Sequence, residues 1–282
     1  MDKNNETANE FESRIAIIHF LFREKTFFPS TEEIHQKLQE KLGNIDIVAK
    51  EEMKLFSLLN YTATFEEEKQ VPIQLMISDY TEAKKDLVPE IAKGQIRVFE
   101  GWEEVLAKCP WQLIITDMLG TWLPAFHRAE VLSSAIDVIL ELYPNCVAVY
   151  YGPSQNLVPA DYVRDNPHEG HKRYLHGGLK ARFFRIQDTD DMLVDTLGLQ
   201  MLGLPDVQYH FHDLDPNLIV NHALNLAYYQ YENDAVIKSG ETVDGVEDEI
   251  WSCQYEESLL EPKRILLDVN TGKYASGNRN HQ

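Results

Sequence analysis

The sequence predicts an α+β protein built from two α/β sandwich units, each with a mostly antiparallel sheet and helices packed on one face. The chain has 282 residues, of which 44% are hydrophobic, which is enough for two medium-sized cores without disulfides. Short apolar runs follow one another as strands of meanders do, and only a few segments have the helical period. A polar stretch rich in Gly and Pro follows Tyr151 and divides the chain.

We therefore expect three segments. An N-terminal α+β unit is expected at residues 11–160, and a C-terminal α+β unit at residues 181–272. Residues 161–180 are interpreted as a linker or loop, because the run RDNPHEGHKRYLHGG is polar and contains Gly and Pro.

The first unit is expected to open in the order β-α-β-β-β. Arg14 to Phe22 is a β-prone apolar run, and the capping box that starts at Ser30 begins a helix that ends at Gly43. Its buried stripe is Ile34, Leu38 and Leu42. The other strands expected in this unit are residues 45–49, 55–64, 71–78, 111–116 and 146–151, and the other helices are residues 102–109 and 123–143.

The second unit contains one long helix among strands. Asp215 is expected to cap this helix, with Pro216 at its first position, and apolar residues around most of its circumference predict that it is largely buried. The strands expected here are residues 181–187, 192–199, 207–212, 235–238, 250–255 and 264–269.

Two glycine-containing elements stand out in this unit, Thr196-Leu197-Gly198-Leu199 and Gly203-Leu204-Pro205-Asp206. We interpret Gly198 as a site of close backbone approach within a strand, and the second element as a turn; the alternative is that both line a ligand cleft. Together with an Asn-x-Ala element followed by Tyr228-Tyr229, they resemble the C-terminal block of a bacterial family, domain of unknown function 4261. The resemblance covers roughly Leu193 to Gly245, with a looser echo at residues 150–158. It implies a fold but no activity, because the family carries no settled catalytic residues.

Composition limits the compartment and the partners. Cys109, Cys146 and Cys253 are far apart and odd in number, which predicts a reducing, cytoplasmic location and no disulfide framework. We expect no signal peptide and no membrane helix, since the opening residues are polar and no apolar run is long enough. The net charge of −20 makes binding to nucleic acid phosphates unfavourable.

The negative charge is concentrated near the C-terminus, where residues 188–282 carry 18 acidic and 5 basic side chains. The acidic residues between Asp244 and Glu257 form the candidate surface for binding a basic protein. Trp251 and Tyr255 would be its apolar anchors if they are exposed, and core residues otherwise. The candidate binding residues are Asp244, Glu247, Asp248, Glu249, Trp251, Tyr255, Glu256 and Glu257.

Two groups of histidines and one further group of acidic residues are weaker candidates for a metal or catalytic site. His168, His171 and His176 could form a metal site or a pH-sensitive loop, or simply a solvated loop. His210 and His212 leave the same face of a strand, which suits two metal ligands or a polar outer face. Asp188, Asp190, Asp191 and Asp195 could hold a divalent cation, although the order of a calcium loop is missing.

No nucleophile elbow, phosphate loop or dinucleotide fingerprint is present in the sequence. We therefore assign no catalytic residue, metal or cofactor and expect a non-catalytic acidic binding protein with a basic protein partner. Its specific form would be an immunity protein that neutralises a cationic bacterial toxin. The alternatives are a metal-dependent hydrolase that uses His210 and His212, and a scaffold or homo-oligomer subunit.

Overall fold

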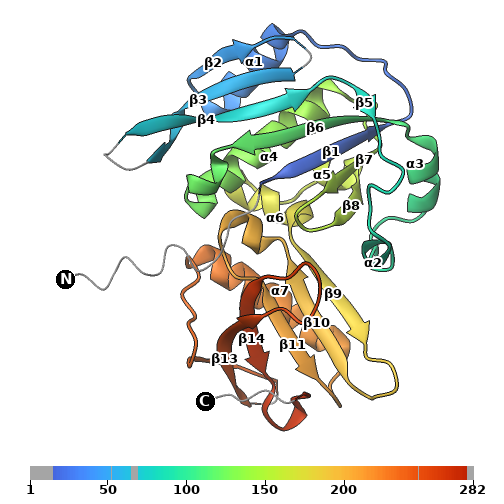
Figure 1. The fold of residues 1–282 in the computed structure, drawn as a ribbon, viewed down its shortest axis with the longest axis vertical. Coiled ribbons are helices and arrows are strands. Elements are labelled where there is room, and N and C mark those ends of the chain that lie inside the picture. Colours follow the sequence, from blue (N-terminus) through green and yellow to red (C-terminus); the bar gives the residue numbers. More distant parts are fainter. Residues whose placement is uncertain (1–14, 52, 65–68, 247, 278–282) are drawn as a thin grey trace. The chain divides into compact units, whose positions relative to one another are not determined.

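The computed structural model describes residues 15–51, 53–64, 69–246 and 248–277, which form two compact units that meet in the sequence between Gly178 and Leu179 (Figure 1). The predicted α+β class is confirmed, since each unit contains a mostly antiparallel sheet together with helices. Within the described residues, no helix has both the length and the apolar character needed to cross a membrane.

The first unit is organised around a fully antiparallel sheet in the order β2-β3-β4-β6-β1-β7-β8, with β5 paired to β6. Its strands are β1 (Ile17–Phe22), β2 (Ile45–Ala49), β3 (Met53–Thr64), β4 (Gln70–Ser78), β5 (Thr81–Glu82), β6 (Trp111–Met118), β7 (Ala148–Tyr151) and β8 (Asn156–Pro159). Its helices are α1 (Thr31–Leu42), α2 (Glu90–Lys93), α3 (Trp102–Lys108), α4 (Ala125–Leu142), α5 (Ala160–Arg164) and α6 (Arg173–Gly178), with short 3₁₀ turns η2 (Gly120–Trp122) and η3 (Gly170–Lys172).

Short-range sequence signals account for several of these elements. The capping box at Ser30 is present: its hydroxyl accepts from the backbone N–H of Glu33, whose carboxylate accepts from the Ser30 N–H, and Gly43 ends α1. Every strand and helix expected before residue 152 is confirmed, with ends shifted by a few residues.

One helix of the first unit is tied to the sheet by a buried ion pair. Arg128 of α4 donates through Nε and Nη2 to the two oxygens of Asp117 on β6, at 2.6 and 2.9 Å, and both side chains are buried. A side chain at Gly120 would collide with the Asp117 carboxylate, which explains the glycine in the turn after β6.

In this unit the segment that contains α2 and α3 also covers a second face of the sheet. Leu21, Ala148 and Tyr150, which share one face of β1 and β7, form a buried cluster with Val88, Ala92 and Val105 from the segment that contains α2 and α3. The intervening residues, such as Phe20 and Val149, are also buried, so both faces of this part of the sheet are covered.

Where a linker or loop was expected at residues 161–180, the chain forms α5, η3 and α6. Arg173 at the start of α6 makes a bidentate ion pair with Asp137 of α4, at 3.0 and 2.8 Å, and this anchors the polar segment. Composition gave no sign of this long-range pairing.

The second unit has a six-stranded sheet in the order β12-β13-β14-β11-β10-β9. Its elements are β9 (Lys180–Arg185), β10 (Met192–Leu197), η4 (Leu199–Leu202), β11 (Val207–Phe211), α7 (Pro216–Glu232), β12 (Thr242–Asp244), β13 (Ile250–Glu257), β14 (Ile265–Asn270) and η5 (Gly272–Tyr274). Only the β11–β14 pair is parallel among the pairs described. Helix α7 packs on β9, β10 and β11, and Figure 1 shows it behind them.

The predicted start of α7 is confirmed: the Asp215 carboxylate accepts from the Asn217 N–H at 2.9 Å, and Pro216 is the first helical residue. The strand expected at residues 235–238 is wrong. Asp234 and Ala235 have positive φ, and the side chain of Gln230 bonds to the backbone of Ile237 in place of a neighbouring strand.

Candidate functional site

A buried network of charges fixes one end of the second sheet. Arg182 of β9 lies opposite Asp195 of β10 and donates to both of its oxygens, from Nε at 2.8 Å and from Nη2 at 2.5 Å. Arg264, just before β14, donates to Asp195 at 2.9 Å and to Asp206 at 3.1 Å. All four side chains are buried, so two cations balance two anions away from water.

The glycine-containing elements form the cradle of Asp206. The Thr196 hydroxyl donates to Asp206 at 3.2 Å, and the Leu199 N–H donates to it at 3.1 Å. Burial raises the pKa of Asp206, while Arg264 and the backbone N–H groups oppose that rise. Gly198 does not lie within a strand as expected: it follows β10 with φ 140, and Gly203 ends η4 with φ 77.

Several acidic turns lie together at the opposite end of the same sheet. Because β11 and β14 are parallel and their neighbours antiparallel, the β9–β10 turn, the β11–α7 turn, the β12–β13 turn and the segment after β14 all lie at this end (Figure 1). Residues 185–191, 212–215, 244–249 and 271–277 contain nine Asp or Glu and two Lys or Arg. The acidic rim comprises the described acids Asp188, Asp190, Asp191, Asp213, Asp215, Asp244, Asp248 and Glu249.

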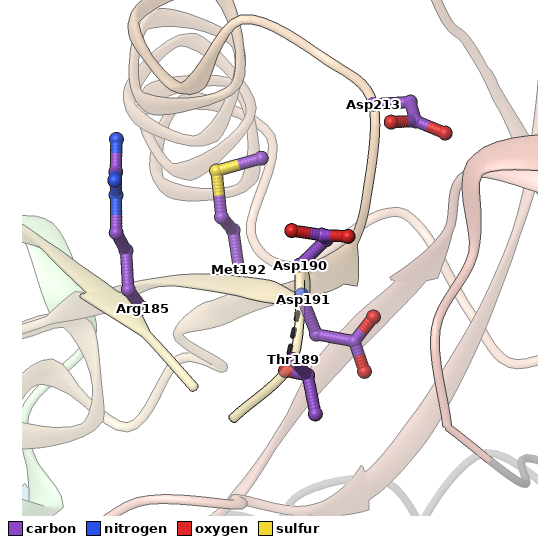
Figure 2. A pocket seen from close by; sticks show the side chains of 6 residues that line it. All are labelled: Arg185, Thr189, Asp190, Asp191, Met192 and Asp213. Atoms are coloured by element: carbon purple, nitrogen blue, oxygen red, sulfur yellow. Dashed lines mark hydrogen bonds between the residues drawn. The ribbon is translucent and has the colours of Figure 1, made fainter. Parts of the chain in front are cut away.

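A pocket of about 280 Å³ opens at the rim, between the β9–β10 turn and Asp213 of the β11–α7 turn. Figure 2 shows Asp190 and Asp191 on one turn, Asp213 on another, and Arg185 beside Met192. Thr189 stabilises its turn by accepting the Asp191 N–H at 3.1 Å. Three of the six lining residues are acidic and one is basic, so the lining has a net negative charge that suits a cationic group.

His210 and His212 each lie near a different rim carboxylate. His210 Nε2 is 3.5 Å from Asp191 Oδ2, and His212 Nδ1 is 3.0 Å from Asp213 Oδ2. Neither histidine lines the pocket. Among the described residues, no group of three or more His, Cys, Asp or Glu side chains is arranged to hold a metal ion.

The candidate binding residues are divided between the two sheet ends. Asp244, Asp248 and Glu249 belong to the rim, whereas Glu256 and Glu257 lie at the far end of β13, roughly 20 Å along the strand. Glu247 lies outside the described residues. The acids that were expected to form a single acidic surface therefore lie on two separate surfaces.

Trp251 is not an exposed anchor. It is 0% exposed and packs against His222 and Tyr209, and a side chain at Gly245 would collide with its indole. Tyr255 is half-buried, and its hydroxyl donates to the backbone of Ile237 at 2.7 Å. The alternative, in which Trp251 belongs to the core, is the one seen.

One cation lies within the rim beside a carboxylate. Lys273 Nζ is 2.7 Å from Glu249 Oε1, and this hydrogen bond lowers the pKa of Glu249. The other rim acids come from turns with strained backbone, since Asp188, Asp213 and Asp248 have positive φ. Asp tolerates this conformation better than most residues do, which partly explains why acids occupy these turns.

The other histidine group lies in the first unit. His176 stacks on Tyr162 at 4.0 Å and lies 5.8 Å from His168, whereas His171 packs against Phe126 at 4.6 Å. The three rings therefore do not converge on one point. Burial lowers the pKa of His176, and His168 lowers it further.

Sequence reasoning missed the rim as a unit. The sequence pattern indicates Asp190 and Asp191 as part of a candidate cation site and Asp215 as a helix cap, but it does not bring these acids together. The signal that joins them is the pairing of Met192 with Phe211, which places the two turns side by side.

Comparison of the chain with known protein families gives a match within the second unit. Residues 195–270 match the sequence profile of a domain of unknown function, DUF4261, which confirms the resemblance and extends it through β14. The matched segment contains Asp195, Asp206 and Arg264. No curated protein and no solved structure matches the chain.

The buried network predicts a large effect of Arg264→Met. This change leaves two carboxylates in the core with one cation, so the free energy of unfolding of the second unit should fall by about 3–5 kcal/mol in urea titrations. The matched control is Lys263→Met, which removes an exposed cation 3.7 Å from Glu257 and should cost less than about 1 kcal/mol. Equal effects of the two changes would contradict the assigned role of Arg264.

The environment of His176 predicts a pH dependence. Because its pKa is lowered in the folded state, the unfolded chain takes up the proton first, so the free energy of unfolding should decrease as pH falls through about 6.5. NMR titration should place His176 below that value and move it upward in His168→Gln. A His176 ring that titrates at or above 6.5 would contradict this.

Proposed function

We propose that this protein is a non-catalytic binding protein whose acidic rim captures a basic protein surface. The observation that supports this most is the convergence of three acidic turns on one end of a sheet. The rim extends roughly 24 Å across the six strands, a width that suits a protein partner better than a small cation. Its exposed carboxylates would attract a cationic partner over a distance and orient its approach.

The specific form of the proposal is an immunity protein that neutralises a cationic bacterial toxin, such as a nuclease with a positive substrate groove. An acidic surface of this width could cover such a groove and block its substrate. We place this activity in the cytoplasm. The three cysteines are free and buried, and burial raises the pKa of the Cys146 and Cys253 thiols to about 12, so they are poor nucleophiles for disulfide exchange.

Charge reversal tests the proposal. Asp190→Lys with Asp244→Lys changes both edges of the rim, and it should weaken binding to purified basic nuclease domains by more than about tenfold in biolayer interferometry and reduce inhibition of the nuclease. The matched control is Glu257→Lys with Glu261→Lys, the same charge change at the opposite end of the sheet.

Salt provides an independent readout. Binding by wild-type protein should weaken steeply between about 0.05 and 0.5 M NaCl, because screening at the higher concentration is nearly complete beyond a few ångströms. If no nuclease domain binds at low salt, or if binding is unaffected by salt and by the rim changes, the proposal fails.

The hydrolase alternative has its own test. The proximity of His210 and His212 to Asp191 and Asp213 is the observation in its favour. A hydrolase of this kind would contain stoichiometric zinc or manganese that is lost on replacing both histidines by Ala. Elemental analysis of the purified protein measures this, and metal that is retained in the variant would exclude these two residues as ligands.

A further inference from the structure

The outer face of α7 lacks the charges that cover the rest of the molecule. The chain is 26% charged, whereas the 17 residues of α7 include one Asp, Glu, Lys or Arg, the last residue, Glu232. Its buried side packs on the sheet through residues such as Ile219, Ala223 and Leu226. Its solvent side is exposed and nearly uncharged.

The exposed residues form a continuous stripe. Asn217, Asn221, Asn225 and Tyr229 recur every four residues and so lie above one another on the helix, with Leu218 beside them. We name these five residues the α7 stripe; it is about 18 Å long. Leu218 is 52% exposed and Tyr229 50%, which are high values for apolar and aromatic side chains.

Helix stability does not explain this stripe. Asn is among the weaker helix formers, and an exposed position could hold Glu, Lys or Gln at lower cost. Within the part of the chain that the structure describes, Asn217 is the one stripe residue whose side chain has a local role: its amide donates to Asp215 at the N-terminus of the helix at 3.0 Å. Depletion of charge together with exposed Tyr and Leu is typical of the centre of a protein interface.

We propose that the α7 stripe is the interface of a homodimer, in which α7 of one protomer packs antiparallel on α7 of its partner across a two-fold axis. A protein of net charge −20 repels its own copies, so a surface that carries no charge meets an identical surface with the least repulsion. Each Asn amide carries both donors and an acceptor, so a row of them is self-complementary under two-fold symmetry.

Other occupants fit the stripe less well. A basic partner would find no carboxylate on the five residues, and nucleic acid would find no cation. A lipid surface would have to dehydrate three amides. The small size of a single helical stripe indicates a weak dimer with a dissociation constant in the micromolar range.

Sedimentation equilibrium of the full chain from about 1 to about 200 µM tests the proposal. Wild-type protein should approach twice its mass of 32.6 kDa at high concentration. Asn221→Glu with Asn225→Glu places like charges across the axis and should raise the dissociation constant of the dimer at least about tenfold. The control, Gln36→Glu with Gln39→Glu, adds the same charge to the exposed side of α1 and should leave it unchanged.

Salt gives a second readout, because screening of the overall repulsion should strengthen this dimer. If Asn221→Glu with Asn225→Glu does not fold by circular dichroism, Tyr229→Glu repeats the test at an exposed position and should also raise the dissociation constant. A wild-type protein that remains monomeric over the whole range, or a dimer equally tight in the folded stripe variant, would overturn the proposal.

Discussion

The second unit depends on a guanidinium that is held between two buried carboxylates. Arg264 connects the start of β14 to Asp206 before β11 and to Asp195 on β10, which lie 58 and 69 residues away in the sequence. Burying any one of these charges alone would cost several kcal/mol, so they can only be buried together. This mutual dependence accounts for the turn at Gly198, which brings the Leu199 N–H to Asp206, a carboxylate that would otherwise be short of donors.

The network also fixes the register of the sheet and thereby the rim. Asp195 lies opposite Arg182 on one side and Gln208 on the other, and Gln208 in turn lies opposite Asp268. A slip of one residue would turn this polar row to the face packed by α7. With the register fixed at the buried end, the turns at the other end need only satisfy their own backbone. They are therefore free to hold acidic residues.

Local signals predicted much of the fold but little of the site. The capping box of α1 and the Asp215–Pro216 start of α7 are short-range features, readable from a few residues. The rim depends on strand pairing: the run from Asp244 to Glu257 looks continuous in sequence, yet β13 carries its two ends to opposite ends of the sheet. The acid at Asp195 looks like another exposed carboxylate and is a core residue, because its two arginine partners lie 13 and 69 residues away. Periodicity cannot detect such partners.

The proposed partner binding at the acidic rim and the proposed dimerisation through the α7 stripe depend on charge in opposite ways, and this links them. A cationic partner on the rim would lower the net charge of each protomer, and a smaller net charge lessens the repulsion between two copies that meet through α7. Thermodynamic reciprocity then requires that dimerisation strengthen capture of the partner by the same factor. The linkage needs no change of conformation, because it follows from the −20 charge of the chain and from the separation of its charged and uncharged surfaces. This linkage should disappear at high salt, because salt screens the electrostatic interaction between the two surfaces.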